Sequence, residues 1–173
     1  MNTELKNYAI DFGTKLGGLL AVSNIIFYAI DYKLFLNPMI GIGFFIVIVI
    51  SGILSSVKGR NIVDNLDYNW SNAFKTYFLT VSVGYLIGSL ATVVIFVIVD
   101  PGAAKILDEE MLIMTKEMME NFGTPQEVIA QIIDEASTKS NFSISSISLQ
   151  YVMNLAIFSV IGLLTSLITK KSN

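Results

Sequence analysis

Four long runs of apolar residues dominate the chain, and most polar residues gather between them. The runs cover about residues 12–30, 38–57, 76–99 and 147–168. An α-helix rises about 1.5 Å per residue and the hydrocarbon core of a bilayer is about 30 Å thick, so about 20 apolar residues are needed to cross it. The pattern therefore predicts four membrane-spanning helices rather than the buried helices of a soluble protein.

The first run is the shortest and depends on its polar flank. It reaches spanning length when the Lys15 side chain extends its amine to the headgroup region. A cleaved signal peptide is the alternative for an apolar run near the N-terminus, but Asp31 and Tyr32 stand where a small-residue cleavage site would be. We therefore expect this run to be retained as the first span.

A different pattern fills the long connection between the third and fourth runs, residues 100–146. Its apolar residues recur every three or four positions, which is typical of amphipathic helices. They are Leu107, Met111, Met114, Met118, Phe122, Val128, Ile129, Ile132, Ile133 and Ala136. We expect two helices that bury these stripes against each other, because methionines at this spacing usually belong to a core rather than to a partner-binding groove.

The stretch GTPQE separates the two expected helices. Gly123 is suited to end the first helix. Thr124 is suited to cap the second, with Pro125 in its first turn and Glu127 completing a capping box. The chain is thus predicted to be an all-α, integral membrane four-helix bundle in one domain, residues 1–173, with an extramembrane helical hairpin inserted at residues 100–146.

The connection between the second and third runs contains aromatic residues beside basic ones. Tyr68, Trp70 and Phe74 precede Lys75, and amphipathic rings of this kind gather where lipid headgroups meet water. We expect a short interfacial helix after Asn69 that leads into the third span.

The spans hold few polar side chains, and none of their midpoints is charged. Asn24 and Asn154 are the strongest polar groups at depth, and they predict interhelical hydrogen bonds or, as the alternative, a polar ligand site. A small-residue stripe, defined by Thr80, Gly84, Gly88 and Thr92, follows one side of the third span. It favours close helix packing, either inside the bundle or between two copies.

The charges predict how the chain is oriented. With four spans, both termini and the second connection share one side, which holds seven of the eleven basic residues but only four of the fourteen acidic ones. Cytoplasmic connections are enriched in lysine and arginine. We therefore expect cytoplasmic termini, a multi-pass protein of the bacterial inner (cell) membrane, and a periplasmic or extracellular 100–146 segment.

The amino-acid composition limits which catalytic and binding roles the chain could have. Hydrophobic residues make up 53% and charged residues 14%, while cysteine and histidine are absent. The chain therefore lacks thiolate chemistry and the commonest general base and metal ligand. Its net charge of −3 does not suit nucleic-acid binding. We expect no catalytic, cofactor or metal-binding residues and no nucleic-acid partner.

Several landmarks give the chain a family resemblance. They are the span entry NWSNAFKTYF at 69–78, Asp100–Pro101, and the Met/Glu-rich segment with its helix restart at 124–127. In this order they resemble the bacterial membrane proteins of the domain of unknown function 4199 family, common in Bacteroidetes-type genomes. Gly102 departs from the polar residue usual after the Asp–Pro pair. The resemblance covers nearly the whole chain and implies a four-span membrane protein with no assigned catalytic or ligand residues.

Three functions follow as hypotheses. The first is a non-enzymatic structural or accessory membrane protein whose acidic hairpin meets a protein partner or a second copy through residues 103–136. The segment 100–139 supports it, since nine acidic and three basic residues give it a net charge of −6. The second is an oligomeric transporter or channel component for ions, small molecules or lipid. The third, a membrane enzyme that pairs Asp100 with Asp108 or Glu109, needs a geometry that spacing does not establish.

Overall fold

Helices account for all the regular secondary structure in the computed structural model, which describes residues 1–63 and 68–170. They are α1 (Thr3–Ile30), the short 3₁₀ helix η1 (Tyr32–Leu36), α2 (Pro38–Gly59), α3 (Trp70–Val93), the π-helical turn η2 (Val94–Val99), α4 (Pro101–Asn121), α5 (Gln126–Ser137) and α6 (Ile144–Thr169). The all-helical prediction is confirmed.

Four helical segments are long and apolar enough to cross a membrane. They are α1, α2, α3 together with η2, and α6, and their mean hydropathy runs from 1.3 for α1 to 2.5 for α2. The four-span prediction is thus confirmed in helix length and composition. The first helix begins at Thr3, earlier than expected, because the Asn2 side chain caps it by accepting a hydrogen bond from the Leu5 N–H.

Short polar caps begin most of these helices. Asn37 caps α2 and Asp100 caps α4, and each is followed by a proline at the first helical position. A proline is favoured there because its fixed φ suits the helix and its missing N–H would have no partner. Asn69 and Ser143 cap α3 and α6 in the same way, through their side-chain oxygens.

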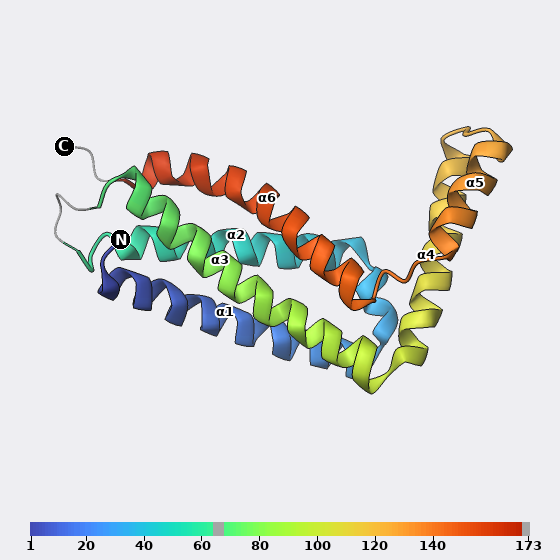
Figure 1. The fold of residues 1–173 in the computed structure, drawn as a ribbon, viewed down its shortest axis with the longest axis horizontal. Helices are drawn as coiled ribbons and strands as arrows, with labels where there is room; N and C mark the ends of the chain where they lie inside the picture. The colour runs from blue at the N-terminus through green and yellow to red at the C-terminus, as the bar shows by residue number, and fades with distance from the viewer. Residues whose placement is uncertain (64–67, 171–173) are drawn as a thin grey trace.

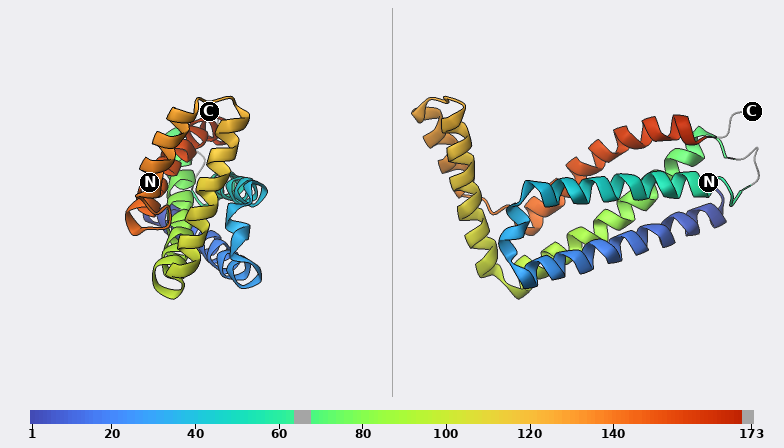
Figure 2. Two further views of the ribbon diagram at one scale, coloured as in Figure 1. Left: turned by 90° about the vertical axis from the view of Figure 1, so that its right-hand side faces the viewer. Right: turned by 180° about the vertical axis from the view of Figure 1, so that it is seen from behind.

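The four spans lie side by side as a bundle, and the start of α1 and the end of α6 are at one end of it (Figure 1). At the opposite end α4 runs across the bundle, and α5 folds back along α4 (Figure 2). We call α4 and α5 the hairpin. The connections η1 and the segment before α6 reach the same end of the bundle as the hairpin.

The small-residue stripe of α3 packs against α1, inside the bundle. A methyl group on Gly84 would lie 2.6 Å from Cδ2 of Leu16, and one on Gly13 would lie 2.7 Å from the Thr80 carbonyl oxygen. The Thr80 hydroxyl donates to the carbonyl oxygen of Ala9 at 3.1 Å. Of the two roles that the sequence allowed for the stripe, internal packing is the one found here.

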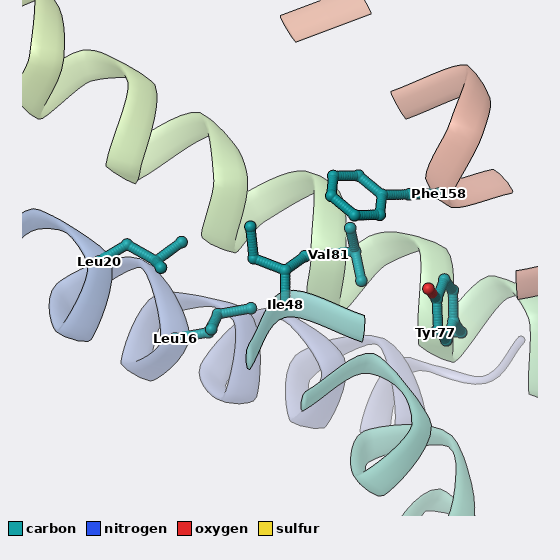
Figure 3. Packing of buried hydrophobic residues seen from close by; sticks show 6 residues of the cluster. All are labelled: Leu16, Leu20, Ile48, Tyr77, Val81 and Phe158. Carbon is teal, nitrogen blue, oxygen red and sulfur yellow. The ribbon is translucent and has the colours of Figure 1, made fainter. Parts of the chain in front are cut away.

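The core of the bundle is centred on Tyr77 and Val81 of α3 (Figure 3). Around them lie Leu16 and Leu20 of α1, Ile48 of α2 and Phe158 of α6. The ring of Tyr77 occupies the space left by two glycines, since a methyl group on Gly52 or Gly162 would lie within 2.6 Å of it. The bundle is therefore closed at this level.

Buried hydroxyl groups join the helices near the termini. Ser56 of α2 donates to the Ala73 carbonyl oxygen at 3.1 Å and lies 2.9 Å from the Thr169 hydroxyl of α6. The Tyr68 hydroxyl donates to the Ser56 carbonyl oxygen, and its side chain is only 1% exposed. Polar groups buried in a membrane protein need such partners.

The helix predicted after Asn69 is the first part of α3 itself. No separate helix follows Asn69; α3 begins at Trp70 and continues without a break. Trp70 is 39% exposed and stacks on Phe74, as expected of interfacial rings. Tyr68 instead packs into a buried cluster with Leu5 and Ala73, because its hydroxyl reaches a helix-end carbonyl group.

The turn of the hairpin also differs from its prediction in one respect. Gly123 ends α4 as expected, with φ of 72°, a left-handed conformation that favours glycine. The N–H groups of Gly123 and Thr124 then bond to the carbonyl oxygens of Glu120 and Met119, which is a Schellman motif. The predicted capping box at Thr124 is wrong: α5 begins at Gln126, and no side chain caps it.

Candidate functional site

Asp100 links the end of η2 to the start of α4 at the hairpin end of the bundle. One of its carboxylate oxygens accepts from the Ala103 N–H at 2.8 Å, and the other accepts from the Tyr28 hydroxyl of α1 at 2.8 Å. These hydrogen bonds hold the pKa of the Asp100 carboxyl below its ordinary value, the Ala103 N–H being the larger cause.

Two further polar contacts fasten α4 to its neighbours. The Lys33 ammonium of η1 pairs with the Glu110 carboxylate, and that hydrogen bond raises the pKa of Lys33. One oxygen of Asp108 accepts from both the backbone N–H and the side-chain amide of Asn141, at 2.9 and 3.1 Å. Both pairs lie in the first half of α4, so the anchoring is concentrated there.

An apolar cluster lies beneath the same half of α4. The buried residues Ala103, Ala104 and Leu107 pack against Ile95 and Phe96 of η2. The π-helical turn, closed by the Asp100 N–H on the Ile95 carbonyl oxygen at 2.8 Å, sets the orientation of the last turn before Pro101. Such single π turns are frequent at functional sites, and apolar periodicity did not reveal this one.

A cavity of about 710 Å³ lies between the bundle and α4. This volume is within the range of about 300 to 1,000 Å³ that is usual for small-molecule sites. Leu20, Ile48 and Phe158 line it and also belong to the buried core, so the cavity reaches into the bundle. Helix α4 contributes one wall through Met111, Met114, Thr115 and Met118.

This wall corrects the prediction for the methionine stripe. Met114 and Met118 are 47% and 54% exposed and face the cavity, whereas only Leu107 of α4 and Ile129 of α5 are buried among the stripe residues. Phe122, at the end of the stripe, is 82% exposed. The spacing identified two amphipathic helices, but it did not identify the neighbour that the α4 stripe faces.

The two asparagines singled out from the sequence both line this cavity. The Asn24 amide nitrogen donates to the Gly88 carbonyl oxygen at 3.2 Å and to the Thr92 hydroxyl at 3.1 Å. The Asn154 amide nitrogen donates to the Tyr85 hydroxyl at 2.8 Å. The predicted interhelical hydrogen bonds are therefore confirmed, and the amide oxygens add polar acceptors to the cavity walls.

Comparison with known families gives a match over nearly the whole chain. The model of the family described as protein of unknown function (DUF4199) matches residues 11–171. The chain belongs to the DUF4199 family. No curated protein and no solved structure matches the chain. The match contains all three landmarks on which the resemblance rested, and Asp100, within one of them, is one of the residues that anchor the hairpin of this DUF4199 protein.

The carboxylates proposed for the enzyme hypothesis have separate positions in this DUF4199 protein. Asp100 contacts Tyr28, while Asp108 lies two helical turns further along α4 and contacts Asn141. Glu109 is exposed. Within residues 1–63 and 68–170, no group of three or more acidic side chains is arranged to hold a metal ion.

We expect the lowered pKa of Asp100 to make the anchor sensitive to acid. Because the folded pKa lies below the ordinary value of about 3.9, the stabilisation is complete above that pH and is lost as the pH falls through the folded pKa. Titration of the Asp100 carboxyl carbon by NMR in detergent should give a pKa below about 3.9. Tyr28→Phe should raise it without restoring the ordinary value, because the Ala103 N–H remains.

Tyr32→Phe is the matched control for this titration. Tyr32 packs against the same apolar cluster, but its hydroxyl makes no hydrogen bond to Asp100. An Asp100 pKa that shifts equally in both variants, or in neither, would contradict the assigned contact.

Proposed function

We propose that this DUF4199 protein is a non-enzymatic accessory protein of the bacterial inner membrane that presents its hairpin to a protein partner in water. The observation that carries the proposal is the anchoring of α4. Its first half is fixed to the bundle by Asp100, Asp108 and Glu110 and by the apolar cluster, while the rest of the hairpin extends beyond these contacts. A pair of helices that is fixed at one end and projects from the bundle is suited to binding a protein partner.

Charge supports a basic partner rather than a second copy. Six acidic side chains of the hairpin are exposed: Glu109, Glu117, Glu120, Glu127, Asp134 and Glu135. Two such surfaces repel each other, whereas a surface rich in lysine and arginine is attracted. The same acidity disfavours a position on anionic lipid headgroups, which supports placing the hairpin outside the membrane.

The orientation is part of this proposal. The start of α1, the end of α2 and the end of α6 share one end of the bundle, and the hairpin lies at the other (Figure 1). Basic residues are enriched in the sequence at these helix ends, which favours a cytoplasmic position for that end. A reporter that is active only in the periplasm, inserted within residues 138–142, should be active. Activity of the same reporter at the C-terminus instead would reverse the orientation.

Crosslinking in living cells tests the partner. A photo-reactive residue at Glu117 or Glu127, both exposed on the hairpin, should give a defined crosslinked product with one protein. The matched control places it at Val160 of α6, an exposed position on a membrane-spanning helix, which should not give that product. Changing Glu109, Asp134 and whichever of Glu117 and Glu127 does not carry the photo-reactive residue to amides should reduce the product strongly. An unchanged yield, or no product, would argue against the proposal.

The cavity favours one second function, an oligomeric transporter or channel component for small molecules, ions or lipid. Beyond the cavity the bundle is closed around Tyr77, which lies against Gly52 and Gly162, so transport would require this end to open. If vesicles that contain the purified protein show no solute flux above that of protein-free vesicles, this function is excluded. A flux that is abolished when the cavity is filled would favour it.

A further inference from the structure

We propose that the cavity binds an uncharged amphiphile, a molecule with a hydrocarbon chain and a hydroxyl or amide head. This inference concerns a small ligand and does not depend on the partner of the hairpin. It rests on the size of the cavity, the division of its walls into apolar and polar parts, and the absence of charge among the side chains that line it.

A glycine leaves space in the wall formed by α2. Gly41 lines the cavity, and a methyl group placed on it would meet no atom within 4 Å. The space is open on one side and has a volume of about 710 Å³, which is within the range of about 300 to 1,000 Å³ usual for small-molecule sites, so it is suited to a ligand that enters from the surface.

The apolar part of the cavity is suited to a hydrocarbon chain. Phe44 and Phe45 of α2 line it together with Phe158 of α6. From the other side, Met114 and Met118 of α4 present flexible thioether side chains that remain half-exposed in the folded chain. Methionine adapts its shape to apolar ligands at low cost, so the chain length that fits here need not be unique.

The polar part of the cavity offers hydrogen-bond acceptors. Asn154 uses its amide nitrogen on Tyr85, and Gln150 uses its own on the Asn141 carbonyl oxygen at 3.1 Å. Their side-chain oxygens are left to accept from a ligand O–H or N–H. Ser89 and Thr92 of α3 add hydroxyl groups on the same walls.

The charge of the ligand is inferred from the charges of the side chains in the cavity walls. Among residues 1–63 and 68–170, the side chains that line the cavity include no lysine, arginine, aspartate or glutamate. The nearby ammonium of Lys33 and carboxylate of Glu110 pair with each other, so neither is left to balance the charge of a ligand. A phosphate or carboxylate head would lose its hydration without gaining a cation, and an ammonium head would gain no carboxylate, so both are penalised relative to a neutral head.

Photo-labelling tests the site with a defined probe. The purified full chain in lipid nanodiscs is exposed to a monoacylglycerol that carries a photo-reactive group in its chain, and the labelled peptides are mapped by mass spectrometry. We expect labels on Met114, Phe45 or Phe158 in excess of those on Leu149, Val152 and Met153 of α6, which are about 60% exposed and lie outside the cavity lining. Equal labelling of the two groups would overturn the proposal.

Two glycine variants provide a matched pair. Gly41→Leu fills the cavity and should reduce cavity labelling at least fivefold. Gly43→Leu makes the same change two residues further along α2, where the added side chain also meets open space but does not line the cavity, and it should leave labelling unchanged. A reduction that is equal in both variants, or absent in Gly41→Leu, would contradict the site.

Two further arms identify the head group and the source of the ligand. A fatty acid with the same photo-reactive chain, anionic at neutral pH, should label the cavity at least fivefold less than the monoacylglycerol. If only the long-chain monoacylglycerol labels the cavity, the ligand is a membrane lipid. If a water-soluble short-chain form labels it equally, the ligand is a soluble amphiphile. Both outcomes support the site. A fatty acid that labels as strongly as the neutral probe would overturn the assigned chemistry.

Discussion

Gly17→Ala should destabilise the bundle by about 1–3 kcal/mol, the usual cost of overpacking a close contact. The added methyl group would lie 2.6 Å from Cβ of Ile87 and 3.0 Å from the carbonyl oxygen of Gly84. Both atoms are fixed by the backbone of α3, so relief requires the two helices to separate. That separation would also strain the hydrogen bonds from the Asn24 amide to Gly88 and Thr92, which lie one and two turns beyond Gly84 on α3.

The adjacent glycine provides the control for this prediction. A methyl group on Gly18 meets nothing within 4 Å, so Gly18→Ala should be neutral or slightly stabilising, since alanine favours the helix more than glycine does. Thermal unfolding in one detergent compares the two variants. Equal midpoints for Gly17→Ala and Gly18→Ala would show that α1 and α3 do not approach as closely as described.

Removal of the Tyr68 hydroxyl should also destabilise the chain, by about 1–3 kcal/mol, because a buried carbonyl group loses its partner. Tyr68 is 1% exposed, and its hydroxyl donates to the Ser56 carbonyl oxygen and lies 3.3 Å from the Ser56 hydroxyl. Tyr68→Phe keeps the ring and its packing, so the loss is confined to these hydrogen bonds. Unfolding by denaturant in mild detergent measures it.

Tyr77→Phe provides the contrast for Tyr68→Phe. The Tyr77 hydroxyl is buried and has no hydrogen-bond partner among the described residues. Its removal deletes an unsatisfied polar group while the ring continues to fill the space between Gly52 and Gly162, so Tyr77→Phe should be neutral or stabilising. A larger loss of stability in Tyr77→Phe than in Tyr68→Phe would contradict the assigned hydrogen bonds.

Local patterns in the sequence predicted the helices well. Apolar length identified the four spans, three- and four-residue spacing identified α4 and α5, and Gly123 marked the turn between them, because each of these signals depends on neighbours in sequence. Asn24 and Asn154 were also predictable as hydrogen-bonding groups, since an amide in an apolar span has few alternatives.

The remaining features depend on contacts between distant segments. Tyr68 packs with Leu5, which is distant in sequence, and its hydroxyl donates to the Ser56 carbonyl oxygen. Met111, Met114 and Met118 of α4 line the cavity, while the first half of α4 is fixed across the end of the bundle. The cavity is lined by residues of α1, α2, α3, α4 and α6, which are far apart in the sequence. No periodicity in one segment contains this information.

The central claim is that lipid surrounds the exposed apolar faces of the four spans while the hairpin lies in water. Because the chain has no cysteine, single cysteines can report on each face in native membranes. Val160 and Ile46 are 60% and 48% exposed in the folded chain, and Glu117 is exposed on the hairpin. Glu117→Cys should react with a water-soluble maleimide about tenfold or more faster than Val160→Cys or Ile46→Cys, because a thiol in lipid is not ionised. Equal rates at the three positions would show that water, rather than lipid, covers the spans.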